Sequence, residues 1–323
     1  MITSRVSPGG RLPRILATLI LLLVIFSSLL AQTVPCPAAS IPVGVRDTNG
    51  TFVSDVPASA FRATVHGKKV DVRSAALPTS GPRVVLILDV SGSMSAKPST
   101  WQHAMEAALD VAGSTTNTHV ALVLFASQVL DVLDFTHSRQ EILDRLQTIA
   151  RRDKPNGSEG KGQTALWDAI LQSSAMLQSP ETGDAIFAIT DGGDNHSERN
   201  WGNAKRQLLQ QGIRFFAFLP FERYFPTEEE KLGIENAESL AEQTGGDWTI
   251  IDGDVQPAAF RQHLALLYDA LIHYYVLNLD LPAFEGKKSL KIEIVDSQRD
   301  KKKQPSAKYP REIYGCPSRS SQK

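Results

Sequence analysis

Residues 84–94 read VVLILDVSGSM, and this stretch decides the fold of the chain. Its first five residues are all apolar, and an unbroken apolar run is typical of a β-strand that is covered on both faces. The run leads directly into Asp89, Ser91 and Ser93, so a carboxylate and two hydroxyls follow the end of a buried strand. Ligands of open α/β sheets bind at this carboxyl edge. The stretch therefore predicts a core strand, 84–90, with a binding site at its end.

Further strands and amphipathic helices alternate along the chain after this stretch. The apolar runs that predict the other strands are VALVLFA (120–126), AIFAIT (185–190), IRFFAFL (213–219) and the weaker TII (249–251). Helix starts are indicated by Ser138 with Glu141 and by Thr227 with Glu230, which both fit capping boxes. The alternation over 83–273 predicts an α/β domain with a doubly wound, mostly parallel sheet and helices on both faces.

The segments that flank this domain have a different pattern. Residues 41–77 contain short alternating runs separated by turn residues, which predicts a small antiparallel β module. After the domain, residues 274–316 contain two more alternating runs, YYVLNLDL (274–281) and SLKIEIVD (289–296). These C-terminal strands either join the N-terminal ones in a single module or stand apart. The polar residues 317–323 are expected to be a disordered tail.

The first 31 residues have the features of a targeting segment. Arg5, Arg11 and Arg14 precede a run without charged residues from Ile15 to Leu30. This predicts a signal peptide, and therefore a protein that is periplasmic, on the cell surface or secreted. Leu29 fits poorly at a cleavage site after residue 31, so retention of residues 15–30 as a membrane anchor is the alternative.

The chain has two cysteines, Cys36 and Cys316, near the two ends of the expected mature protein. In an oxidising compartment such a pair favours one disulfide over a metal site, which would need further Cys or His nearby. The alternative is two unrelated thiols on the tails.

Net charge excludes one class of partner. With 34 basic and 35 acidic residues, the formal net charge is -1 at pH 7. Such a chain has no overall field to attract nucleic acid or an anionic membrane. We therefore expect no nucleic-acid partner, and membrane contact only through a retained N-terminal anchor.

Two other oxygen-rich loops complete the candidate site. Thr164 lies in the glycine-rich stretch GKGQT before a predicted helix, and Asp191 follows the strand AIFAIT. Loops from the two halves of a doubly wound sheet meet where the strand order reverses. Hydroxyls, carboxylates and water are hard oxygen ligands, which favours Mg²⁺ or Mn²⁺ over Zn²⁺. Because few of these ligands are anionic, the bound cation could accept a carboxylate from another molecule.

These residues carry a family resemblance. Asp89, Ser91, Ser93, Thr164 and Asp191 match, in the same order, the metal-ion-dependent adhesion site of von Willebrand factor type A domains. The resemblance covers about 83–273 and implies an α/β binding module rather than an enzyme. It implies that Ser91, Ser93 and Thr164 bind the metal directly, while the two aspartates act through water or through the serines.

The flanks extend this resemblance more loosely. The stretch DTNGTFVSDVPASAFRATVHGKKVDV before the domain, together with YYVLNLDL and REIYG after it, resembles the exported, acidobacterial-type VWFA-related proteins of bacteria. The combined expectation is an exported adhesion-type module that captures an Asp or Glu of a partner protein through Mg²⁺ or Mn²⁺. The resemblance identifies no particular partner.

Other interpretations of the same residues compete with this one. Ser91 could cap the next helix, and Asp168 and His196, close to the site, are typical of a capping-region carboxylate and an exposed loop residue. A metal-dependent hydrolase would use the same position, but the sequence contains no G-x-x-x-x-G-K-[ST] or G-x-S-x-G motif. A structural envelope protein with a vestigial metal site is the third possibility.

Overall fold

The computed structural model describes residues 40–114, 117–151, 163–221, 227–281, 284–295 and 304–315. The expected signal segment, both cysteines and the tail 317–323 lie outside these residues. Within the described residues, no helix is long and apolar enough to cross a membrane.

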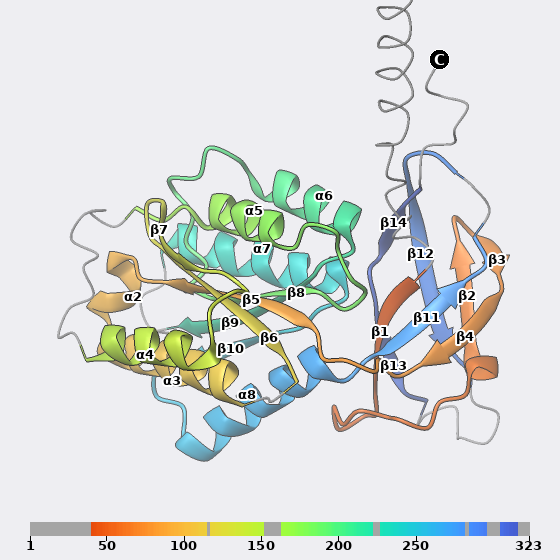
Figure 1. Cartoon of the computed structure of the whole chain (residues 1–323), viewed down its shortest axis with the longest axis horizontal. Coiled ribbons are helices and arrows are strands. Elements are labelled where there is room, and N and C mark those ends of the chain that lie inside the picture. The colour runs from red at the N-terminus through yellow and green to blue at the C-terminus, as the bar shows by residue number, and fades with distance from the viewer. Residues whose placement is uncertain are drawn as a thin grey trace, which may run out of the picture. The chain divides into compact units, whose positions relative to one another are not determined.

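A six-stranded sheet forms the centre of the α/β domain (Figure 1). Its strand order is β10-β9-β8-β5-β6-β7, and the strands are β5 (Arg83–Asp89), β6 (His119–Phe125), β7 (Val129–Leu133), β8 (Ala185–Ile189), β9 (Arg214–Phe221) and β10 (Trp248–Asp252). Five strands are parallel, as expected, and only β7 runs antiparallel, at the edge beside β6. After β5, the chain first adds β6 and β7 on one side of this strand and then β8, β9 and β10 on its other side. The direction in which successive strands are added therefore reverses between β5 and β8. The loops after these two strands carry Asp89 and Asp191.

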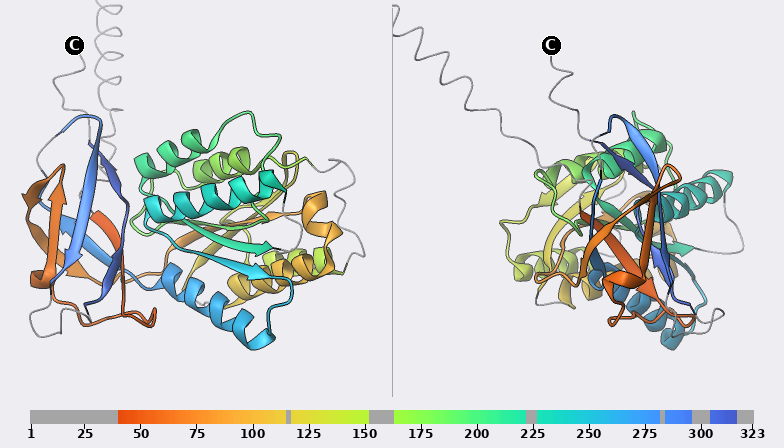
Figure 2. Two further views of the ribbon diagram at one scale, coloured as in Figure 1. Left: turned by 180° about the vertical axis from the view of Figure 1, so that it is seen from behind. Right: turned by 90° about the vertical axis from the view of Figure 1, so that its right-hand side faces the viewer.

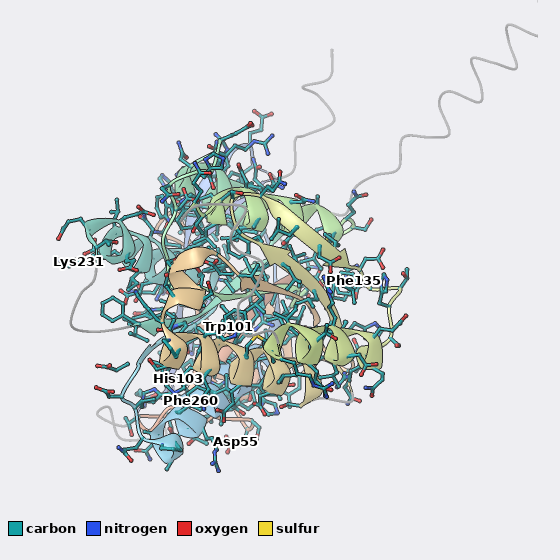
Figure 3. All side chains as sticks on the ribbon, turned by 90° about the vertical axis from the view of Figure 1, so that its left-hand side faces the viewer. Asp55, Trp101, His103, Phe135, Lys231 and Phe260 are labelled. Atoms are coloured by element: carbon teal, nitrogen blue, oxygen red, sulfur yellow. The ribbon has the colours of Figure 1, made fainter. Side chains whose placement is uncertain are left out.

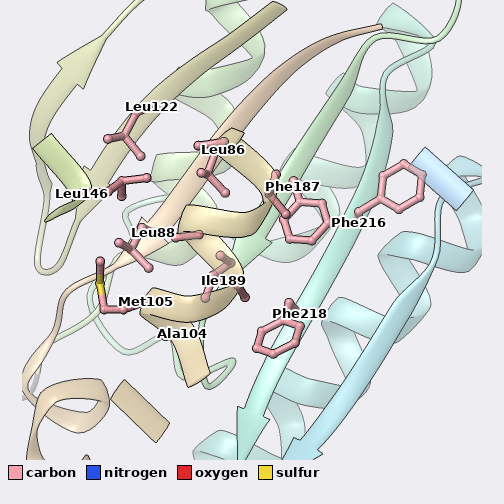
Figure 4. Packing of buried hydrophobic residues seen from close by; sticks show 14 of the residues in the cluster. Leu86, Leu88, Ala104, Met105, Leu122, Leu146, Phe187, Ile189, Phe216 and Phe218 are labelled. Atoms are coloured by element: carbon pink, nitrogen blue, oxygen red, sulfur yellow. The ribbon is translucent and has the colours of Figure 1, made fainter. Parts of the chain in front are cut away.

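Helices cover both faces of this sheet. They are α2 (Gly92–Ala96), α3 (Pro98–Gly113), α4 (Arg139–Ala150), α5 (Leu166–Met176), α6 (Trp201–Gln211), α7 (Glu228–Thr244) and α8 (Pro257–Ile272). Because side chains alternate along a strand, Leu86 and Leu88 pack with α3, α4 and α8, as Figure 4 shows in part. Val85 and Ile87 point the other way and pack with α5, α6 and α7. A strand buried on both faces explains the unbroken apolar run.

Helix ends follow the capping signals. The capping boxes of Ser138 with Glu141 and of Thr227 with Glu230 are both present, at the starts of α4 and α7. A third box, Asn200 with Asn203 at the start of α6, was not predicted, because both of its members are asparagines and it lacks the Ser or Thr followed by Glu of the other two.

The flanking segments form two four-stranded antiparallel sheets (Figure 2). Buried apolar side chains from both sheets form one core. One sheet has the order β13-β1-β11-β4 and the other β14-β12-β2-β3. The strands are β1 (Ser40–Arg46), β2 (Phe61–Val65), β3 (Lys68–Val70), β4 (Val72–Ala76), β11 (Tyr275–Leu279), β12 (Lys287–Ile294), β13 (Ser306–Lys308) and β14 (Glu312–Tyr314). Each sheet contains both N-terminal and C-terminal strands.

Local hairpin signals were only partly informative in this β module. The turn at His66 and Gly67, with φ of 48° and 77°, joins β2 and β3 as the sequence indicated. The turn after Asp47 is also present, but β1 contacts the following segment only through a bridge between Arg46 and Phe52. Its strand partners are β11 and β13, from the other end of the chain.

Candidate metal centre

Asp89, the last residue of β5, is fully buried and held in one orientation. Its Oδ1 accepts a hydrogen bond of 2.9 Å from the backbone N–H of Ser91, and its Oδ2 accepts one of 2.7 Å from the Thr190 hydroxyl. Thr190 lies at the end of the neighbouring strand β8. The carboxylate is therefore positioned from both sides of the point where the strand order reverses.

The two serines after Asp89 bring their hydroxyls together. Ser91 Oγ and Ser93 Oγ lie 3.0 Å apart. The Ser91 hydroxyl lowers the pKa of Asp89 and the Ser93 hydroxyl lowers that of Asp191, so each serine lies beside one aspartate. Ser91 occupies the N-cap position of α2, yet its side chain makes no capping hydrogen bond. The capping interpretation of this serine is therefore wrong.

Asp191 is the second buried carboxylate, with a relative exposure of 1%. Its Oδ1 accepts a bond of 3.2 Å from the Gly193 N–H. Its Oδ2 is buried and has no hydrogen-bond partner among the described residues. A buried carboxylate oxygen without a partner is costly, so each such atom calls for a physical explanation.

Burial and mutual repulsion disfavour two negative charges at this position. Burial and the charge of Asp191 raise the pKa of Asp89 from its ordinary 3.8 to about 7. Burial, and then the charge of Glu230, likewise raise the pKa of Asp191, although Ser93 and the nearby Lys97 oppose this. Carboxylates whose ionised form is disfavoured in this way are stabilised by a nearby cation.

Thr164 lies at the start of α5 and is almost completely buried. Its backbone is bonded to the loop that follows Asp191: the Thr164 N–H donates to Asn195 Oδ1, and the Thr164 carbonyl accepts from the N–H groups of Asn195 and His196, all at 3.0 Å. The structure thus joins the Thr164 loop to the Asp191 loop. His196 itself is exposed and contributes only its backbone.

Two other carboxylates near the site have structural partners. Asp194 Oδ1 accepts the N–H of Leu166 at 2.8 Å and so caps α5 from a distant loop. Asp168 accepts the N–H groups of Glu198 and Arg199 at 2.8 and 3.2 Å. Both carboxylates therefore fix the loop between β8 and α6.

The first turn of α7 also borders the site, which the sequence did not indicate. Glu230 Oε1 lies 2.9 Å from Lys97 Nζ, at the junction of α2 and α3. Asn195 donates to Glu229, and a Cβ at Gly193 would lie close to both Glu229 and Asp191. Glu230 was recognised only as part of a capping box, and the pairing of two residues 133 positions apart leaves no local signal.

The residues present fit a small hard cation. Asp191 Oδ2 is a buried carboxylate oxygen without a hydrogen-bond partner among the described residues, and Ser91 Oγ and Ser93 Oγ lie 3.0 Å apart in the neighbouring loop. Carboxylate and hydroxyl oxygens suit Mg²⁺ or Mn²⁺. In the described part of the chain, no group of three or more His, Cys, Asp or Glu is placed to hold a metal. The site therefore depends on its hydroxyls, and zinc, which prefers nitrogen and sulfur, does not suit it.

The α/β fold fits that of a von Willebrand factor type A domain. The model of the von Willebrand factor type A domain matches residues 84–193, the part of the chain that carries all five candidate ligands. Residues 84–193 are thus similar to a domain family whose members are generally protein-interaction modules.

Solved structures of low sequence identity are also similar. The conserved hypothetical protein BatB from Bacteroides thetaiotaomicron is 20% identical, with 59% of this chain and 98% of that chain covered and a TM-score of 0.45. An aerotolerance-related membrane protein from Bacteroides fragilis is 19% identical, with the same coverage and TM-score. A von Willebrand factor type A protein from Catenulispora acidiphila is 13% identical, with 86% and 75% covered and a TM-score of 0.44. No curated protein matches the chain.

Proposed function

We propose that this chain is an exported binding protein that captures a partner protein through a bound Mg²⁺ or Mn²⁺. The ligands of the metal are drawn from Asp89, Ser91, Ser93, Thr164 and Asp191. The observation that carries the proposal is Asp191 Oδ2, a buried and unpartnered carboxylate oxygen beside a second buried carboxylate. A cation would satisfy this oxygen and relieve the repulsion between the two aspartates.

The hydrogen bonds at the site support a direct role for the serines and a supporting role for Asp89. Both oxygens of Asp89 are already bonded, to the Ser91 N–H and to the Thr190 hydroxyl. The two serine hydroxyls lie 3.0 Å apart, and each favours the ionised form of the aspartate beside it. Hydroxyl ligands are neutral, so the metal would retain positive charge and act as a Lewis acid toward a partner's Asp or Glu carboxylate.

Calorimetric titration of Mg²⁺ into the full chain tests the metal site. We expect one bound ion in the wild type and none in Asp191→Ala or Thr164→Ala. Asp168→Asn is the matched control, because Asp168 lies nearby but has only backbone partners from the loop at 198–199. Absence of binding to the wild type would support the vestigial site of a structural envelope protein instead.

Capture of a partner requires a separate experiment. Wild type and Thr164→Ala are immobilised and exposed to envelope extract with Mg²⁺ or with EDTA, and the captured protein is then tested with its acidic residues changed one at a time. We expect capture to require metal, Thr164 and one partner carboxylate. Capture that persists undiminished in EDTA would show that the contact lies elsewhere.

The hydrolase alternative is tested on the same material. Phosphatase and esterase substrates are incubated with the metal-loaded chain and with Asp89→Ala. We expect no turnover, because an interaction module has no need of a nucleophile at this position. Turnover that disappears in Asp89→Ala would favour the enzyme.

A further inference from the structure

A partly buried ion pair stands beside the candidate metal centre. Lys97 Nζ and Glu230 Oε1 are 2.9 Å apart, and the side chains are 23% and 8% exposed. The other oxygen of Glu230 accepts the backbone N–H of Thr227 at 2.8 Å. Glu230 is therefore fixed from two sides, and its charge is compensated by Lys97 rather than by water.

The pair lies close enough to the centre to act on it. A Cβ on Gly193 would lie 3.2 Å from Glu229 Oε1 and 3.4 Å from Asp191 Oδ1, so the first turn of α7 stands beside Asp191. The backbone brings the two elements together as well, because Gly233 of α7 lies against Gly192, next to Asp191. Figure 3 looks onto this end of the domain, where Lys231 marks the first turn of α7.

Lys97 offsets part of the acidic charge at this end of the domain. Asp89, Asp191 and Glu230 are buried carboxylates, and Lys97, which is partly exposed, is paired with Glu230. When all four are ionised, Lys97 reduces their net charge from three negatives to two. Glu229, which also lies near Gly193, is exposed and screened by water.

We propose that Lys97, by neutralising Glu230, sets the charge of the metal centre and keeps it receptive to a partner's carboxylate. Lys97 is a positioning and tuning residue and not a ligand. Without its charge, Glu230 becomes a third uncompensated carboxylate beside the ion. The centre then holds Mg²⁺ more tightly and repels an incoming carboxylate. This inference rests on the proposed metal site and specifies how its charge is regulated.

A double-mutant cycle on Lys97 and Glu230 in the full chain tests this inference, with Mg²⁺ alone as the first probe. We expect Lys97→Met to raise Mg²⁺ affinity about tenfold and Glu230→Gln to lower it about tenfold, since each change alters the field at the ion by one unit charge. The double variant restores the wild-type charge and should bind within about twofold of the wild type, although the ion pair is gone. Lys97→Arg keeps the charge and should also behave as the wild type.

Acetate is the second probe. In the Mn²⁺-loaded protein, displacement of metal-bound water by acetate is followed through water proton relaxation. We expect Lys97→Met to need several-fold more acetate than the wild type for the same displacement of water. The double variant should need the same amount of acetate as the wild type. Metal and acetate affinities thus change in opposite directions, which loss of folding would not produce.

The outcomes separate this inference from the proposed function. If the pair were only structural, all variants that break it would lose thermal stability and Mg²⁺ affinity together, and the double variant would not recover. That result would overturn the role of Lys97 while leaving the metal site intact. A wild type that binds no Mg²⁺ would overturn the metal site and this inference with it.

Discussion

Gly233 of α7 lies directly against Gly192 of the loop that carries Asp191, so that a Cβ on Gly233 would overlap the Gly192 carbonyl oxygen. Gly192 has a φ of 88°, a conformation that a residue with a side chain rarely adopts. Two glycines therefore allow the backbones of α7 and of the metal-site loop to touch. This contact places the charges of the α7 first turn next to Asp191.

Gly233→Ala is expected to damage stability and metal binding together. The added methyl must push α7 away from the Asp191 loop, which should cost about 1–3 kcal/mol of unfolding free energy and weaken Mg²⁺ binding. Gly113→Ala is the control, because a Cβ there would meet only Leu143 Cδ2 at 3.9 Å. Denaturant unfolding and calorimetry measure both effects. Wild-type Mg²⁺ affinity in Gly233→Ala would show that this contact does not position Asp191.

Asp89→Asn should stabilise the metal-free protein and abolish its response to metal. The amide retains an oxygen for the Ser91 N–H but removes a buried negative charge beside Asp191. At pH 8 we expect the metal-free variant to be more stable than wild type by roughly 1–3 kcal/mol. Thermal melts with and without Mg²⁺ provide the measurement. A variant less stable than the wild type would mean that Asp89 is primarily a structural hydrogen-bonding group.

Mg²⁺ affinity should rise with pH and level off above about 7. The folded protein retains a proton on Asp89 to about pH 7, whereas the unfolded chain releases it near 3.8. Stability of the metal-free protein should therefore fall as pH rises from about 4 to 7, because the folded state binds more protons there. Metal competes with the same proton, so its binding strengthens over that range. Titrations at pH 5, 6, 7 and 8 check both trends, and Asp89→Asn should flatten them.

Arg214→Met should destabilise the domain far from the metal centre. The guanidinium of Arg214 is fully buried and donates to the carbonyls of Gly183, Ala270 and Leu271, and so ties the end of α8 to the sheet. Its removal leaves these carbonyls without their donor, at a cost of about 2–4 kcal/mol. Arg206→Met, on the exposed side of α6, should change stability by less than about 0.5 kcal/mol. Equal unfolding midpoints for the two variants would contradict this role.

Export and the disulfide are two predictions about residues outside the described part of the chain, and both can be tested on the same preparation. The arginines before residues 15–30 predict fractionation outside the cytoplasm. Pairing of Cys36 with Cys316 should make the non-reduced chain migrate faster, and in the chain-entropy model it stabilises by up to about 5 kcal/mol. Cys316→Ser provides the control lane. Identical mobility with and without reductant would exclude the disulfide.

The amino-acid sequence by itself determined the strands of the central sheet and the candidate ligands. An apolar run covered on both faces differs in composition from everything around it, so β5, β6, β8 and β9 were predicted to within a few residues. Asp89 and Asp191 stand at the ends of such runs, so the prediction of the strands also predicted that these residues lie at the carboxyl edge of the sheet. Their role as metal ligands stays a prediction.

The tertiary structure decided what depends on contacts between distant segments. β7 is a short edge strand in which Leu130 and Val132 are exposed, so no buried run marked it. The pairing of β1 with β11, where Ser40 bonds to Asn278 across 238 positions, has no signature in either segment. The same holds for Lys97 with Glu230. Local sequence encodes local conformation and burial, whereas the partner of a strand or a charge is selected by packing of the whole chain.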